Sequence, residues 1–272
     1  MRRGGRRGAP AGRRAGWLRL ALAAGALATL ALFVLAAVER PSTETAARPA
    51  ASSPKPPGGG DGRAEREGPP PEGSCDHLLV LVDREHALPP SYAPRDLVPL
   101  RAYGVPALDP NLLLRREAAR SLALLVRAAA AEGHELAVAS AYRSHKEQRA
   151  AHARWASYYG DENAGGLSAL PGHSQHQLGT AVDFTNAEAG YEVWQGFGRT
   201  EASRWLERNA PRYGFVLAYP LGGQEKTGYA WEPWHYRYIG KEAARRMQRS
   251  GLDLQEFLLR EGVRPGCGRG GG

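Results

Sequence analysis

The sequence predicts an α+β domain between Cys75 and Cys267, in which a small antiparallel sheet is flanked by helices. Two kinds of pattern carry this prediction. Some segments place apolar residues at helical spacing, whereas others are short apolar or alternating runs that are typical of strands. These segments follow one another without the regular strand–helix–strand alternation of a parallel sheet. The irregular order favours an α+β architecture.

The first part of this domain is expected to contain two strands and one helix. An apolar run at residues 78–82 predicts a short strand. Asp109 followed by Pro110 is typical of a helix N-cap and first helical position, and the apolar residues that follow predict a helix up to Gly133. Residues 135–142 alternate as a second strand would.

The central part begins with a helix start signal. Ser144 and Glu147 have the spacing of a capping box, so we expect a helix that continues through Tyr159. The glycine-rich residues 160–172 predict a loop. The segment TAVDF, residues 180–184, then predicts a short strand.

The last part of the domain is expected to hold three helices and one more strand. Thr200 can cap a helix over residues 201–214, and FVLAY at residues 215–219 predicts a strand. Helical patterns at residues 241–249 and 252–261 close the domain.

Three segments of distinct composition precede the domain. Residues 1–19 form a basic tail, and residues 20–38 carry no charge over about the length that crosses a bilayer. Arginines before an apolar span keep that end in the cytoplasm, so we expect a single-pass membrane anchor with an extracytoplasmic domain. A cleaved signal peptide, which would release the domain, is the alternative. Residues 39–74 are rich in Pro, Gly and Ser and predict a disordered linker.

The net charge does not indicate a nucleic-acid-binding protein. The whole chain carries +8, but arginines within residues 1–19 provide +7, which leaves 8 − 7 = +1 for the remainder. Binding to phosphates requires basic residues on the folded part of a protein. We therefore expect no nucleic-acid partner.

The chain has two cysteines, Cys75 and Cys267, at the two ends of the expected domain. In an oxidising exported compartment this arrangement predicts a disulfide that joins the ends of the domain. Two separate free thiols are the alternative.

Two histidines and two carboxylates stand out as candidate site residues. The turn at Gly179 allows His176, in the loop, and Asp183, on the following strand, to converge on one point. His235 lies in a separate aromatic segment, three residues after Glu232. Two imidazoles and one carboxylate leave a fourth position open on a tetrahedral ion, as in catalytic zinc sites.

Three segments together resemble a known family. SAYRSHKEQ (140–148), SQHQLGTAVDF (174–184) and TGYAWEPWHYRYIG (227–240) are similar to the signature segments of the VanY-like D-alanyl-D-alanine carboxypeptidases. These are zinc peptidases of peptidoglycan that share a core with the dipeptidase VanX and the hedgehog signalling domain. The resemblance covers about residues 75–262 and implies the hedgehog/DD-peptidase fold.

The resemblance implies a role for each of five residues. His176, Asp183 and His235 would bind Zn²⁺, and Glu232 would act as the general base. Zinc lowers the pKa of bound water toward about 7, and a neighbouring carboxylate can accept the proton. Arg143 would stabilise the developing oxyanion or hold substrate oxygens, which suits its planar charged group.

Further polar and aromatic residues have less defined roles. Gln148 and Ser174 resemble family positions that hydrogen-bond the substrate peptide. His173 lies close to the expected ligands but does not align with one. The aromatic residues around His235 are expected mainly to fill the core, with one or two forming a wall of the substrate cleft; they are Trp231, Trp234, Tyr236 and Tyr238.

We therefore expect a zinc D,D-carboxypeptidase, acting as a monomer, that removes the C-terminal D-alanine from peptidoglycan stem peptides. An L,D-carboxypeptidase acting on tetrapeptide stems is one alternative. A non-catalytic zinc-containing module that binds the cell wall is another, although such a module would be expected to lack at least one of Glu232, Arg143 and the three ligands.

Overall fold

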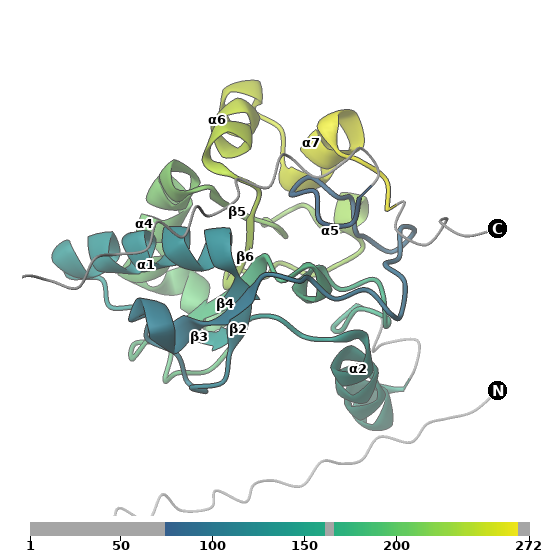
Figure 1. The fold of residues 1–272 in the computed structure, drawn as a ribbon. Coiled ribbons are helices and arrows are strands. Elements are labelled where there is room, and N and C mark those ends of the chain that lie inside the picture. The colour runs from purple at the N-terminus through teal and green to yellow at the C-terminus, as the bar shows by residue number, and fades with distance from the viewer. Residues whose placement is uncertain (1–73, 161–165, 266–272) are drawn as a thin grey trace, which may run out of the picture. The chain divides into compact units, whose positions relative to one another are not determined.

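The computed structural model describes residues 74–160 and 166–265 (Figure 1). The expected basic tail, the apolar span at 20–38, nearly all of the linker and Cys267 lie outside these residues and stay predictions. Within the two described ranges, no helix has both the length and the apolar character needed to cross a membrane.

A four-stranded antiparallel sheet forms the centre of the domain, in the order β3-β4-β6-β5. The expected fold class, a small antiparallel sheet with flanking helices, is confirmed (Figure 1). The strands are β3 (Ala137–Ser140), β4 (Ala181–Thr185), β5 (Phe215–Leu217) and β6 (His235–Tyr238). The runs at 135–142, 180–184 and 215–219 thus became strands, each shorter than or shifted slightly from its predicted span.

A second, two-stranded sheet was not predicted. Strand β1 (Leu97–Pro99) pairs antiparallel with β2 (Leu113–Arg115), and a 3₁₀ helix, η1 (Leu100–Tyr103), follows β1 directly. The prediction that a helix begins at Pro110 is wrong, because the helix begins at Arg116. The side chain of Asp109 accepts a hydrogen bond from the N–H of Asn111, at 2.8 Å, in a local turn.

Helix α1 (Arg116–Ala131) therefore begins after β2 and supplies the largest apolar face of the core. Its residues Leu122 and Leu125 are fully buried in the same cluster as Trp205 of α4 (Glu201–Asn209). The helix predicted over 201–214 ends at Asn209 and continues only as a 3₁₀ turn, η4 (Ala210–Tyr213). Pro211 explains this difference, because proline cannot donate the hydrogen bond that a longer α-helix requires.

The N-terminal arm is buried but is not the strand predicted at residues 78–82. It forms only an isolated bridge between Val80 and Val263. The guanidinium of Arg237, a buried residue of β6, donates to the carbonyls of Leu78 and Val80, at 2.9 and 2.6 Å. These backbone groups are thus used by a side chain and by the C-terminal segment instead of a sheet ladder. Cys75 is buried and is not a free thiol.

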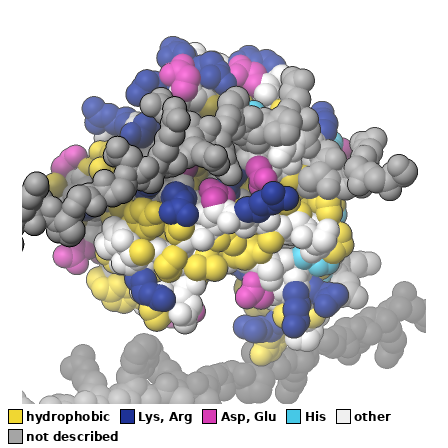
Figure 2. Space-filling model, in the orientation of Figure 1, with side chains coloured by type: hydrophobic (Ala, Val, Ile, Leu, Met, Phe, Trp, Pro, Cys, Tyr) yellow, Lys and Arg dark blue, Asp and Glu magenta, His cyan; other side chains and the backbone are white. Residues whose placement is uncertain are grey.

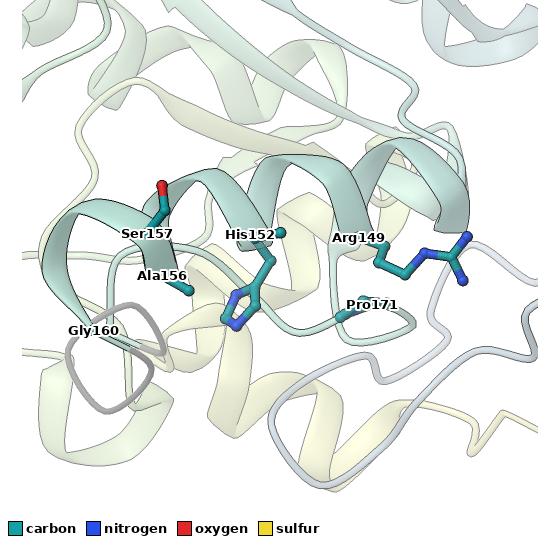
Figure 3. A pocket seen from close by; sticks show the side chains of 7 residues that line it. Arg149, His152, Ala156, Ser157, Gly160 and Pro171 are labelled. Carbon is teal, nitrogen blue, oxygen red and sulfur yellow. The ribbon is translucent and has the colours of Figure 1, made fainter.

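Helix α2 (His145–Tyr159) projects from the body of the domain (Figure 1). The predicted capping box is confirmed, since Ser144 accepts from the N–H of Glu147 while Glu147 accepts from that of Ser144. Only Gln148 of this helix is buried. A shallow hollow of about 530 Å³ runs along the helix, where His152 points toward the segment of Pro171 (Figure 3). Few core contacts therefore hold α2.

The C-terminal helices are confirmed close to their predicted limits. They are α6 (Lys241–Ser250) and α7 (Leu254–Glu261), and the short α5 (Gln224–Thr227) precedes them. Basic and acidic side chains stand beside one another at the top of the view (Figure 2). In α6, Glu242 pairs with Arg245.

Loss of the α4 cap should destabilise the fold measurably. The hydroxyl of Thr200 accepts a hydrogen bond from the N–H of Ser203, at 3.1 Å, and is buried. Thr200→Ala is expected to lower the free energy of unfolding by about 1 kcal/mol in urea titrations. The exposed Glu207→Ala change in the same helix is the control and should have a much smaller effect. Equal stability of the Thr200→Ala variant and the unchanged protein would contradict the capping role.

Candidate active site

The central sheet brings two of the predicted ligands face to face. Asp183 of β4 pairs directly with His235 of β6 in the antiparallel register, so their side chains lie on the same face of the sheet. His176 comes from a 3₁₀ helix, η2 (Gln175–Leu178), that immediately precedes β4. Gly179, with φ +65°, makes the turn between them, because a left-handed conformation favours glycine.

The three side chains form a buried cluster that could hold a metal ion. One candidate ligand atom from each of His176, Asp183 and His235 lies within 4.8 Å of the other two. The Asp183 carboxylate lies 3.2 Å from Nε2 of His176 and 2.9 Å from Nδ1 of His235. The convergence inferred from the sequence is therefore present.

Hydrogen bonds on the outer sides of both rings aim their lone pairs at the cluster. Nδ1 of His176 lies 2.6 Å from the carbonyl oxygen of Ala141 and must donate to it. Nε2 of His235 lies 3.3 Å from Oε1 of Gln175, and Nδ1 lies 2.9 Å from the Asp183 carboxylate. In the tautomer in which Nε2 donates to Gln175, the inner nitrogens of both rings are free to bind a cation beside the carboxylate. This donor set fits a divalent metal such as zinc.

The electrostatics of the cluster keep its ligands in their binding forms. Burial alone would raise the pKa of Asp183, but the adjacent His176 and His235 lower it well below its usual range. Burial lowers the pKa of His176, although Asp183 opposes this effect. At neutral pH the carboxyl is therefore ionised and the His176 imidazole is neutral, as metal binding requires.

Glu232 lies beside the cluster, in the loop before β6. Its Oε2 is 3.9 Å from Nδ1 of His235, and its backbone N–H donates to the carbonyl of Tyr219. Burial raises the pKa of Glu232 to about 7, while His235 lowers and Asp183 raises it. A carboxyl with a pKa near neutrality can both accept and return a proton.

Arg143 is held at the edge of the same site. Its guanidinium donates to Oε1 of Gln148, at 2.8 Å, and to the hydroxyl of Ser140, at 2.9 Å. The amide nitrogen of Gln148 donates in turn to the carbonyl of Ala169, at 2.7 Å. The same nitrogen also donates to the hydroxyl of Ser168, at 3.3 Å. Gln148, which holds Arg143, therefore has only the remaining lone pair of Oε1 for its expected contact with substrate.

Two other predicted polar residues have distinct surroundings. The hydroxyl of Ser174 accepts from the N–H of His176, at 3.3 Å, and so caps η2. His173 does not join the cluster, because its Nδ1 lies 2.7 Å from the carbonyl of Asp83.

One pocket of about 500 Å³ contains the cluster and the neighbouring polar groups, but His173 does not line it. The seven residues that the sequence singled out all contribute to its lining; they are Arg143, Gln148, Ser174, His176, Asp183, Glu232 and His235. The aromatic run around His235 divides as expected: Tyr236 and Tyr238 are buried in the core, whereas Trp231 and Trp234 line the pocket.

Gln175, Trp155 and Trp194 are among the lining residues that were not identified from the sequence. Gln175, which orients His235, shows no pattern beyond its position next to a ligand. Trp155 lies seven residues after Gln148 on the same helical face, a spacing that could have identified it. Trp194 lies in an irregular segment without any periodic signal.

Comparisons with known proteins agree with this geometry. The family model described as VanY, D-alanyl-D-alanine carboxypeptidase, matches residues 111–241. A putative carboxypeptidase, YodJ, of Bacillus subtilis (strain 168) is 38% identical over 184 residues, which are 67% of each protein.

Two solved structures share the fold. The LdcB LD-carboxypeptidase, described in terms of peptidoglycan recognition, has a TM-score of 0.64 and 37% identity, over 68% of this chain and 87% of that one. A point mutant of the vancomycin resistance D,D-pentapeptidase VanY from a VanB-type resistance cassette, in complex with Zn(II), has a TM-score of 0.56 and 34% identity, over 66% and 98%.

Substitution of a metal ligand should lower the metal content of the protein. His176→Ala and His235→Ala should each remove one of three ligands and lower metal content after dialysis to a small fraction of one equivalent. Ser157→Ala, at an exposed hydroxyl of α2, is the control and should retain the full content by elemental analysis. Full occupancy in both histidine variants would contradict the assignment.

Metal affinity should also depend on pH. Protons compete with the metal for the ligands, and burial lowers the pKa of His176, so this ligand stays neutral somewhat below the value of about 6.5 of an exposed histidine. Zinc affinity, measured by competition with a coloured chelator, should fall as the pH falls from 7 to 5. An unchanged affinity across that range would contradict this.

Proposed function

Because the chain belongs to the VanY family of D-alanyl-D-alanine carboxypeptidases, we propose that it is a zinc-dependent enzyme that removes the C-terminal D-alanine from peptidoglycan stem peptides. One observation carries the proposal above all. A three-ligand cluster with an open side, a carboxyl of raised pKa and a held arginine share one pocket. This combination provides the elements of metal-assisted peptide hydrolysis.

The residues divide the work as follows. Zinc held by His176, Asp183 and His235 would supply a Lewis acid that polarises a carbonyl and lowers the pKa of a coordinated water. Gln175 and the carbonyl of Ala141 keep both imidazoles oriented, so the ligands need no rearrangement.

Glu232 moves the proton. Its carboxylate accepts a proton from the water that attacks the scissile carbonyl, and the resulting acid donates that proton to the nitrogen of the departing D-alanine. No covalent bond between enzyme and substrate is needed.

Arg143 stabilises the oxygen that becomes negative when water adds to the carbonyl. Its hydrogen bonds to Gln148 and Ser140 fix the guanidinium before substrate arrives. A donor fixed in advance does not have to reorganise in the transition state, which makes its charge more effective.

L,D-carboxypeptidase activity on tetrapeptide stems is the second candidate. The LdcB LD-carboxypeptidase has the higher TM-score of the two structures described above, 0.64 against 0.56. Incubation of the purified protein with synthetic pentapeptide and tetrapeptide stems, followed by mass analysis, separates the two activities. We expect the pentapeptide to lose D-alanine faster; exclusive cleavage of the tetrapeptide would favour the alternative.

We also propose that the catalytic domain lies outside the cytoplasmic membrane, held by the apolar span at residues 20–38. The sequence of that span and the arginines before it support this placement. We further propose that the protein acts as a monomer and binds no nucleic acid.

Glu232→Gln should separate catalysis from metal binding. The amide has nearly the same shape but cannot accept the proton, so kcat should fall by about 10²–10⁴-fold. Zinc content, measured in parallel, should stay near one equivalent because Glu232 is not part of the ligand cluster. Unchanged turnover in this variant would exclude the mechanism.

Replacement of Arg143 tests the oxyanion role. Arg143→Ala should lower kcat by about 10²–10³-fold with a smaller change in KM, because the interaction is strongest in the transition state. Arg204→Ala, at an exposed residue of α4, is the matched control for loss of an arginine and should leave kcat near that of the unchanged protein. A change confined to KM in Arg143→Ala would instead indicate ground-state binding.

A further inference from the structure

The pocket that holds the metal cluster has an aromatic wall that the reaction itself does not use. Four of the six tryptophans in the chain line this pocket; they are Trp155, Trp194, Trp231 and Trp234. Several apolar lining residues are nevertheless well exposed, including Trp155 (40%), Leu167 (45%) and Trp194 (52%). Exposed apolar side chains gathered at one place usually mark a binding surface. We use the term aromatic rim for Trp155, Trp194 and Trp231.

The indoles of the aromatic rim are held in place without being buried. The indole of Trp194 lies against Gly196 and that of Trp231 against Gly198, where a Cβ at either glycine would overlap the ring. Nε1 of Trp194 also donates to the carbonyl of Ala189, at 3.3 Å. Fixed, exposed aromatic faces lose little conformational entropy when a ligand stacks on them.

On α2, Trp155 is supported in a similar way. Its ring stacks on that of Tyr159, with centroids 5.5 Å apart and an interplanar angle of 22°. Gln148, which holds Arg143, lies seven residues earlier on the same helix, so Trp155 is roughly 10 Å further along the helix axis. An extended peptide covers that distance in about three residues. Trp155 is therefore within reach of a part of a stem peptide about three residues from an end held near Arg143.

Within the described residues, the pocket lining away from the catalytic end carries no charged side chain. Among the described residues that line the pocket, the only Arg, Asp or Glu side chains are Arg143, Asp183 and Glu232, which all belong to the catalytic end. A stem peptide carries carboxylates and amines, whereas the sugars to which it is attached are N-acetylhexosamines without a charge on the ring. One face of such a ring is a flat surface of C–H groups that can stack on an indole.

We infer that the aromatic rim binds an N-acetylhexosamine ring of the glycan strand, so that the enzyme takes glycan-linked stem peptides in preference to free ones. This inference rests on the proposed function for its substrate class. It assigns to the rim a ligand different from the peptide at the metal cluster.

Kinetics with two substrates test the inference. The substrates are a free stem pentapeptide and the same pentapeptide linked to an N-acetylglucosamine–N-acetylmuramic acid disaccharide. The unchanged enzyme should have a kcat/KM about tenfold higher for the glycan-linked form, and Trp155→Ala and Trp194→Ala should bring this ratio toward one. Trp155→Phe, which keeps a flat ring, should retain much of the preference.

Tyr158→Ala is the matched control, because Tyr158 is an aromatic residue of α2 that is 78% exposed and does not line the pocket. It should keep the ratio of the unchanged enzyme. A ratio near one in the unchanged enzyme would overturn the inference. So would rim variants that lower kcat/KM equally for both substrates, since the rim would then hold the peptide.

Direct binding separates this inference from the proposed function. Chitotetraose, a peptide-free N-acetylglucosamine oligomer, is titrated into the full-length Glu232→Gln protein while tryptophan fluorescence is followed. Saturable quenching that Trp194→Ala weakens about tenfold supports glycan binding, even if neither peptide substrate is cleaved. Absence of binding at millimolar oligosaccharide overturns the inference, while cleavage of free pentapeptide would leave the proposed function intact.

Discussion

The contact of one carboxylate with two imidazoles determines how the rest of the site is built. Asp183 meets His235 because β4 and β6 pair in a register that places them directly opposite, and it meets His176 because a glycine turn leads from η2 into β4. A shift of one residue in that register would move the side chain of Asp183 to the other face of the sheet. The α1–α4 core fixes the sheet and thereby the register, so packing far from the pocket is also a condition of the chemistry.

The two histidines of the cluster are oriented by different kinds of hydrogen-bond partner, one from the backbone and one from a side chain. His176 is oriented by a backbone carbonyl at the end of β3, which no substitution can remove, whereas His235 is oriented by the side chain of Gln175. Arg143 follows the second pattern, since Gln148 holds its guanidinium. The positions of Arg143 and of the His235 imidazole thus depend on two glutamine amides, which add no charge to the site.

Much of the site could be predicted from sequence because its ligands lie in local patterns. His176, Gly179 and Asp183 are close in the chain, and Ser144 with Glu147 marks the start of α2 by local hydrogen bonds. The errors arose where distant residues decide the outcome. The carbonyls at residues 78 and 80 are taken by Arg237, more than 150 residues away, so an apolar run with strand character did not form a strand. Asp109-Pro110 favours a turn and a helix start equally, and only the pairing of Leu113–Arg115 with β1 decides between them.

The bridge between Val80 and Val263 holds the first and last segments of the described domain next to each other. Since the entering and leaving segments are fastened to each other, additional polypeptide at either end joins at the same spot and need not disturb the sheet. The fold therefore allows a link between these neighbouring segments, with the backbone reopened at a surface turn away from the cluster. Fusion of this domain to other domains is therefore expected to leave its central sheet and core intact.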